Sequence, residues 1–300
     1  MSDMRRNVPL LPQLAGEASP GIVGIRTLDG RIGNPGYAIF PIVKVVNKRV
    51  HLIGTGFFIT DNGLFATAKH VLMDPFDEDG REKYGIGLFH FIENNIYIPR
   101  PILRFSAHPI ADVAVGVAAP MQNNELKQPL TNPYMFLDFG EVPIDSNAVT
   151  YAYPRFSSTQ EGNSQKVEFN ATYYDGYVRE YFPNGRDKVF LPGPCYQTSI
   201  HIHGGASGGP VFGPSGLVFG INSTGIDGTD ISYVSRMSDI LHLRADDVVV
   251  NDVSRSILVS DFIRAQQPVP SDTLDGSPGS RRPRVSAGKS AVAFQTAIKS

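Results

Sequence analysis

The 300-residue sequence predicts an all-β fold in two halves, each a barrel or a sandwich, followed by one helix near the C-terminus. Three observations favour this prediction. Short segments rich in β-branched and aromatic residues recur along the chain, separated by Gly, Asn, Asp and Pro. Helical periodicity is weak before residue 253. A polar stretch with several prolines, residues 121–146, divides the strand-like segments into two sets and predicts a linker.

The first half is predicted to span residues 21–120, after an N-terminal extension of residues 1–20. A DNG turn at residues 61–63 predicts that residues 54–72 form a hairpin that leads to His70. We expect the first of the strand-like segments to open this half. The segments are GIVGIRTL (21–28), YAIFPIVKVV (37–46), HLIGTGFFIT (51–60), IGLFHFI (86–92), NIYIPRPILRF (95–105) and DVAVGVA (112–118).

The second half is predicted to span residues 147–250. A C-terminal helix is predicted over residues 253–267, where apolar residues recur at helical spacing. Residues 268–300 are rich in Pro, Ser, Gly and Arg, which predicts a disordered, flexible tail. The strand-like segments of this half are NAVTYAYP (147–154), KVEFNATYYDGYVREYF (166–182), KVFLPG (188–193), CYQTSIHI (195–202), PVFGPSGLVFGINS (210–223) and ISYVSRM (231–237).

Composition narrows the class of protein. The formal net charge of −2 gives no basic field for nucleic acid. The single cysteine, Cys195, excludes an intrachain disulfide, and we expect it to be a buried apolar residue. No apolar run approaches the roughly 18 residues of a membrane span, and the N-terminal residues lack a signal-peptide core. We therefore expect a cytoplasmic protein without a nucleic-acid or membrane partner, and export by a leaderless route stays open as an alternative.

Three residues suggest nucleophilic chemistry. Ser207 lies among four glycines in GGASGGPVF (204–212), but a serine needs a base and an acid to become a nucleophile. Small residues precede His70 and let two backbones approach closely, as a buried catalytic histidine requires. His90 and His108 lack such residues and are expected to be surface or strand residues. Asp112 opens an apolar strand, where a buried carboxylate would need a partner such as an imidazole. Taken singly, these residues also fit a glycine-rich turn, a structural histidine and a helix or turn cap.

ATAKHV around His70, ADVAV around Asp112 and GGASGGPVF around Ser207 resemble, in that order, the three signatures of the chymotrypsin-like serine peptidases. QTSIHIHGGASGGPVF and GTGFFIT resemble the disulfide-free bacterial members, including the heat-shock protease group. The resemblance covers about residues 21–245. It implies two antiparallel six-stranded β-barrels, with the two halves as the barrels and the site across their interface.

The resemblance also implies a role for each residue. Ser207 would attack the scissile carbonyl, His70 would take its proton, and Asp112 would orient the imidazole. The N–H groups of Gly205 and Ser207 would form the oxyanion hole. Ser223 to Gly225 would pair with the substrate backbone, as an edge strand does. The residues expected to line the substrate site are His201, Ile202, His203, Asn222, Ser223, Thr224 and Gly225.

The resemblance implies a serine endopeptidase that forms an acyl-enzyme on a peptide or protein substrate, without a metal or other cofactor. Ile202 favours an apolar substrate side chain, while His201 and His203 leave an acidic one open. The digestive relatives have an aspartate where this chain has Ala206, so no ion pair with a processed N-terminus can form. Two alternatives remain open: a catalytically silent trypsin-fold module that binds peptides or proteins, and a protease that an activating partner switches on.

Overall fold

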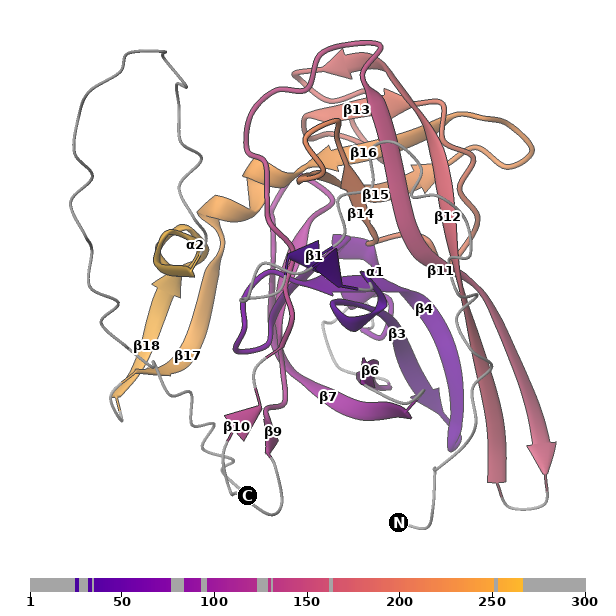
Figure 1. The fold of residues 1–300 in the computed structure, drawn as a ribbon, viewed down its shortest axis with the longest axis vertical. Coiled ribbons are helices and arrows are strands. Elements are labelled where there is room, and N and C mark those ends of the chain that lie inside the picture. Colours follow the sequence, from indigo (N-terminus) through magenta and orange to yellow (C-terminus); the bar gives the residue numbers. More distant parts are fainter. Residues whose placement is uncertain are drawn as a thin grey trace.

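A computed structural model gives the fold and describes residues 25–26, 32–33, 35–76, 84–92, 96–122, 129–130, 132–161, 164–250 and 253–266 (Figure 1). Two closed six-stranded antiparallel barrels confirm the predicted fold class. The first barrel comprises β3 (Ile39–Val46), β4 (Arg49–Phe58), β5 (Leu64–Thr67), β6 (Gly85–Ile92), β7 (Ile96–Ala107) and β8 (Ala114–Ala118). The second comprises β11 (Asn147–Glu161), β12 (Ser164–Phe182), β13 (Cys195–Thr198), β14 (Pro210–Phe212), β15 (Val218–Gly225) and β16 (Ser232–Arg236).

The two barrels share one topology. Their strand orders are β3-β4-β5-β8-β7-β6 and β11-β12-β13-β16-β15-β14, so each third strand pairs with the sixth. Aromatic side chains fill the first barrel, where the Phe40 ring lies 4.6 Å from that of Phe58 and 5.5 Å from that of Phe65, centroid to centroid. Closure removes the free sheet edges and leaves the connecting loops to carry the site.

The ends of the barrels differ from the prediction. Within residues 21–28 only β1 (Ile25–Arg26) is a described strand, and it pairs with β2 (Ile32–Gly33) in a separate two-stranded sheet. A 3₁₀ turn, η1 (Pro35–Tyr37), follows, so the first barrel begins at β3. The second barrel ends at β16, before a second 3₁₀ segment, η2 (Met237–His242). The linker carries a further strand pair, β9 (Met121–Gln122) and β10 (Pro129–Leu130).

Two predicted elements are corrected. The predicted helix over residues 253–267 begins as a strand, β18 (Val253–Leu258), which pairs with β17 (Arg244–Val250), and only α2 (Val259–Gln266) is helical. β-Branched residues such as valine favour strands, and the sequence of β17 is rich in valine. Residues 253–258 therefore pair with β17, although their apolar spacing fits a helix. Residues 188–193 form bends rather than a strand, because the Asp187 carboxylate accepts the N–H groups of Val189 and Phe190 that a strand would use.

A long hairpin joins the barrels. Strands β11 and β12 extend beyond the second barrel along the outside of the first (Figure 1). Near its tip, the Gln165 side chain accepts the N–H of Val50 at 2.9 Å and donates to its carbonyl oxygen at 3.4 Å. The Phe169 ring packs 5.1 Å from that of Phe89. The second barrel therefore also contacts the first through the outer part of this hairpin.

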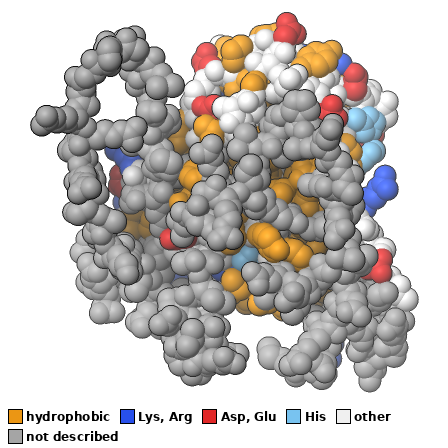
Figure 2. All heavy atoms as spheres, in the orientation of Figure 1, with side chains coloured by type: hydrophobic (Ala, Val, Ile, Leu, Met, Phe, Trp, Pro, Cys, Tyr) orange, Lys and Arg blue, Asp and Glu red, His pale blue; other side chains and the backbone are white. Residues whose placement is uncertain are grey.

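The surface over the barrels carries mixed charge. Figure 2 shows single acidic and basic side chains between apolar ones on the described part of this face. Cys195 is buried, as expected, and burial raises its pKa to about 11. Among the described residues, no helix is long and apolar enough to cross a membrane. The predicted N-terminal extension, residues 1–20, and the predicted tail, residues 268–300, lie outside the described residues.

Candidate active site

His70 lies in the first turn of a short helix, α1 (Lys69–Met73), directly after β5. Ala68 before it is fully buried, and Val71 and Leu72 after it anchor the helix in the core of the first barrel. The small side chain of Ala68 lets the chain turn against the barrel without a clash. The expectation of a buried histidine was wrong: Ala68 is the buried residue, whereas the His70 side chain is 51% exposed and faces outward, where a substrate can reach it.

Asp112, in the loop between β7 and β8, is the partner of this histidine. Its carboxylate accepts the ring Nδ1–H of His70, at 2.9 Å to Oδ2 and 3.1 Å to Oδ1, and the backbone N–H of His70 at 3.0 Å. The hydroxyl of Ser223 also donates to Oδ2. Burial raises the pKa of Asp112, but the hydrogen bonds and charge of His70 and the Ser223 hydroxyl outweigh burial and bring this pKa below its ordinary value. The carboxylate is therefore ionised at neutral pH.

Ser207 comes from the second barrel and meets this pair through Ser223. The Ser207 hydroxyl donates to the carbonyl oxygen of Ser223 at 3.1 Å, while the hydroxyl of the same Ser223 binds Asp112. Among the described residues, no hydrogen bond joins the Ser207 hydroxyl to His70. The structure thus brings all three predicted residues to the barrel interface, with the serine turned toward β15.

The turn before Ser207 has a geometry suited to binding an anion. The N–H of Ala206 donates to the carbonyl oxygen of His203 at 3.1 Å, and Gly205 at the third position has φ +88°. This combination defines a type II turn, which needs a positive φ at that position and therefore glycine. The N–H groups of Gly205 and Ser207 donate to no described group, which leaves two donors free for an oxyanion.

Thr55, on β4, anchors this turn from the first barrel. Its backbone N–H and its hydroxyl donate, each at 2.8 Å, to the carbonyl oxygens of Ser207 and Gly205. Sequence analysis singled out the GTGFFIT segment but assigned no role to Thr55. The sequence signal that could have pointed to Thr55 is its position between two glycines. In the structure, a Cβ added to Gly54 would lie only 2.9 Å from the Ser207 carbonyl oxygen. The close approach of the two backbones requires the glycine.

The predicted substrate-site residues divide into three groups. His201 and His203 are exposed, with ring centroids 4.7 Å apart. Ile202 is buried against Gly225: a Cβ added to Gly225 would lie 3.0 Å from the Cγ1 atom of Ile202. Asn222 differs from its prediction: it is fully buried, its amide donates to the Thr150 hydroxyl, and its backbone groups bind Gly208 and Gly209. It supports the serine turn rather than lining an open site.

Ser223 and Thr224 lie along β15 between these groups. Ser223 is buried and contacts both Asp112 and Ser207, while the Thr224 side chain is exposed. The pairing of β15 with β14 ends at Ile221, whereas its pairing with β16 continues to Gly225. One edge of residues 223–225 therefore remains open beside the serine.

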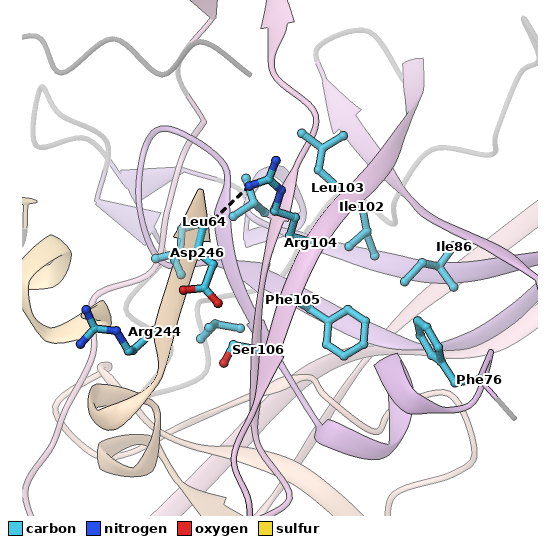
Figure 3. Close-up of a pocket in the computed structure, with 13 residues that line it drawn as sticks. Leu64, Phe76, Ile86, Ile102, Leu103, Arg104, Phe105, Ser106, Arg244 and Asp246 are labelled. Carbon is cyan, nitrogen blue, oxygen red and sulfur yellow. Dashed lines mark hydrogen bonds between the residues drawn. The ribbon is translucent and has the colours of Figure 1, made fainter. Parts of the chain in front are cut away.

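A separate cavity of about 340 Å³ lies on the first barrel, away from these residues (Figure 3). Its lining comes from β7, β8 and β17 among other segments, and Arg104 donates to the carbonyl oxygen of Asp246 at its edge, at 3.3 Å. None of His70, Asp112 and Ser207 lines it. Among the described residues, no group of three or more His, Cys, Asp or Glu side chains is arranged to hold a metal ion.

Residues 54–221, more than half of the chain, match the model of the trypsin-like peptidase domain family. The fold is similar to that of the active form of the Rv3671c protease from M. tuberculosis, with 17% identity, a TM-score of 0.47, and 69% of this chain and 78% of that chain covered. It is also similar to Deg5, with 15% identity, a TM-score of 0.48, and 67% and 84% covered.

No curated protein sequence is similar enough to the chain to be matched. The family match alone spans both predicted catalytic segments of the first barrel and the serine turn of the second. It confirms the resemblance expected from the three sequence motifs. The chain therefore belongs to the trypsin-like peptidase family.

Proposed function

We propose that the protein is a serine endopeptidase, with Ser207 as nucleophile, His70 as base and Asp112 as the acid that orients the base. The observation that supports this most is the Asp112 carboxylate, which accepts hydrogen bonds from the ring and backbone of His70. Ser223 joins the same carboxylate to the Ser207 hydroxyl. An ionised, partly buried carboxylate holding a half-exposed imidazole is the arrangement that general-base catalysis needs.

The chemistry follows from this geometry. With Nδ1–H donated to Asp112, the other ring nitrogen of His70, Nε2, is free to accept a proton. The Ser207 hydroxyl must rotate from the Ser223 carbonyl to Nε2, and it then attacks the substrate carbonyl. Its proton passes through His70 to the leaving amine as the acyl-enzyme forms, and water completes hydrolysis by the reverse route. The N–H groups of Gly205 and Ser207 stabilise the negative oxygen.

The open edge of β15 supports a peptide substrate. A peptide in extended conformation adds to such an edge through backbone hydrogen bonds, which places its scissile bond beside Ser207. Ile202, packed on Gly225, supports preference for a medium-sized apolar side chain before the scissile bond. The type II turn with its two free N–H groups supports an active enzyme over a silent peptide-binding module.

Labelling with a fluorophosphonate probe tests the proposal. The wild-type protein would be compared with Ser207→Ala and His70→Ala, and mass spectrometry would locate the adduct. We expect an adduct on Ser207 in the wild type and none in either variant. A folded wild-type protein that does not react, or an adduct elsewhere that persists in Ser207→Ala, would contradict the assignment. A peptide library then measures the preferred side chain.

A further inference from the structure

The turn that carries Asp112 is held by a histidine. His108 lies directly after β7, four residues before Asp112, and its backbone N–H donates to the carbonyl oxygen of Val113 at 2.9 Å. Within this turn, the N–H groups of Ile110 and Ala111 both donate to the His108 Nδ1 atom, at 3.2 Å and 2.8 Å. One ring nitrogen thus replaces the carboxylate or amide oxygen that usually caps such a turn.

These two hydrogen bonds fix the protonation state of the ring. A nitrogen that accepts from two N–H groups carries no proton, so His108 is neutral, with its proton on Nε2. Ala111, directly before Asp112, is only 1% exposed, so its N–H has no access to water if the ring stops accepting. The neutral ring therefore determines the backbone path immediately before the carboxylate.

The surroundings keep the ring neutral. Burial lowers the pKa of His108; Asp239 on η2 raises it; His242 on η2 and Lys69 on α1 lower it, and the net pKa lies below its ordinary value. Lys69 also donates from Nζ to the carbonyl oxygen of Pro109 at 3.2 Å, so it supports the same turn. Protonation of Nδ1 would place its N–H against the N–H groups of Ile110 and Ala111, so both hydrogen bonds would be lost and the turn would open.

We propose that His108 is a positioning residue for the catalytic acid: its neutral imidazole holds the turn that aims Asp112 at His70, and its protonation releases that turn. The inference rests on the proposed function. Two protonations then slow the reaction as the pH falls, one on the base and one on the ring that positions the acid. A logarithmic plot of reactivity against pH steepens at its acid end from a slope of about 1 toward about 2.

The test uses two variants that separate the ability of the side chain at position 108 to accept hydrogen bonds from its ability to take up a proton. His108→Ala removes the acceptor, whereas the side-chain oxygen of His108→Asn accepts the same two N–H groups and does not titrate. The readout is the second-order rate constant of fluorophosphonate labelling between about pH 4.5 and 8. We expect His108→Ala to react about 10- to 100-fold more slowly at neutral pH. His108→Asn should recover most of that loss and keep a slope of about 1 throughout.

Equal labelling of wild type and His108→Ala, or a wild-type slope that stays at about 1, would overturn the inference. A folded wild type that does not label contradicts the proposed function instead, and an activity-independent measurement then decides on His108. In ¹⁵N NMR at neutral pH, we expect an unprotonated Nδ1 in His108 and an Ala111 amide that exchanges slowly in the wild type and rapidly in His108→Ala. A protonated Nδ1, or an Ala111 amide unaffected by the substitution, would overturn the positioning role.

Discussion

The backbone N–H of Thr55 donates to the carbonyl oxygen of Ser207 at 2.8 Å, so a residue of the first barrel holds the peptide group of the proposed nucleophile in the second. The hydroxyl of the same threonine donates to the carbonyl oxygen of Gly205 and accepts the N–H of Tyr153 at 3.0 Å. Thr55 is fully buried, so water cannot replace these contacts. The turn before Ser207 is thus fixed from across the barrel interface.

Replacing Thr55 by valine should slow the enzyme more than replacing it by serine. Valine keeps the shape but leaves the Gly205 carbonyl and the Tyr153 N–H without their partner, which frees the turn to move. We expect a roughly 10-fold lower fluorophosphonate labelling rate in Thr55→Val and a near-normal rate in Thr55→Ser. A misplacement of about 1 Å can cost about 100-fold, and the loosened turn should move by less than that. Equal rates in the two variants would exclude a role for the hydroxyl.

The two glycines before Ala206 should respond differently to alanine. Gly205 has φ +88°, and a Cβ there would lie 2.7 Å from the Tyr153 carbonyl oxygen, whereas a Cβ on Gly204 meets nothing within 4 Å. We expect Gly205→Ala to lose at least about 100-fold in labelling rate, the cost of one misplaced oxyanion donor. Gly204→Ala is the matched control and should stay within about threefold of wild type. Similar losses in both would mean that the turn geometry does not matter.

Ile202 should limit the size of the substrate side chain. In Ile202→Ala the space beside Gly225 opens, so peptides with Phe before the scissile bond should gain and those with Val should lose. A difference of about 10-fold in relative kcat/KM is expected, the usual effect of a few methylene groups in an apolar pocket. The measurement is a peptide library cleaved by wild type, Ile202→Ala and Ile202→Val. An unchanged profile in all three would place the specificity pocket elsewhere.

Acid should destabilise the first barrel through His90. Its Nδ1 lies 3.1 Å from Nη1 of Arg100, and burial, with the charge of Arg100, lowers its pKa from 6.5 to about 4. Because the folded pKa is below the unfolded one, the unfolded chain binds more protons between these values. The free energy of unfolding therefore falls by about 3 kcal/mol as the pH drops from 6.5 to about 4.

Urea unfolding of wild type and His90→Gln across this pH range checks the prediction. Glutamine can accept from Arg100 and donate to the Tyr37 carbonyl oxygen, which His90 Nε2 contacts at 2.9 Å, but it does not titrate. The pH dependence should be smaller in the variant by about the amount assigned to His90. The same slope in both proteins would show that other groups cause the acid sensitivity.

The sequence predicted the features that depend on local residue patterns and on the order of the motifs. Segments rich in β-branched and aromatic residues predicted two β-rich halves, and the family resemblance implied that each half is a barrel. Three short motifs predicted the residues that meet at the barrel interface. Contacts between distant segments were missed. Thr55 and His108 act through backbone groups whose positions only the folded chain defines, and the Asp187 carboxylate prevents a strand by taking its N–H donors. The prediction of a helix from residue 253 was wrong because residues 253–258 pair with β17 as a strand, and this long-range pairing is not visible in the local apolar spacing.

The long β11–β12 hairpin has a consequence for how the protein folds. Gln165 binds Val50, a residue 115 positions earlier, so this contact of the first barrel forms only after β11 and the start of β12 have been synthesised. Such non-local contacts place the chain among the slowly folding topologies. The two barrels, linked by this hairpin and by Thr55, should accordingly form in a single concerted event, and a chain interrupted between them would expose an incomplete surface to aggregation.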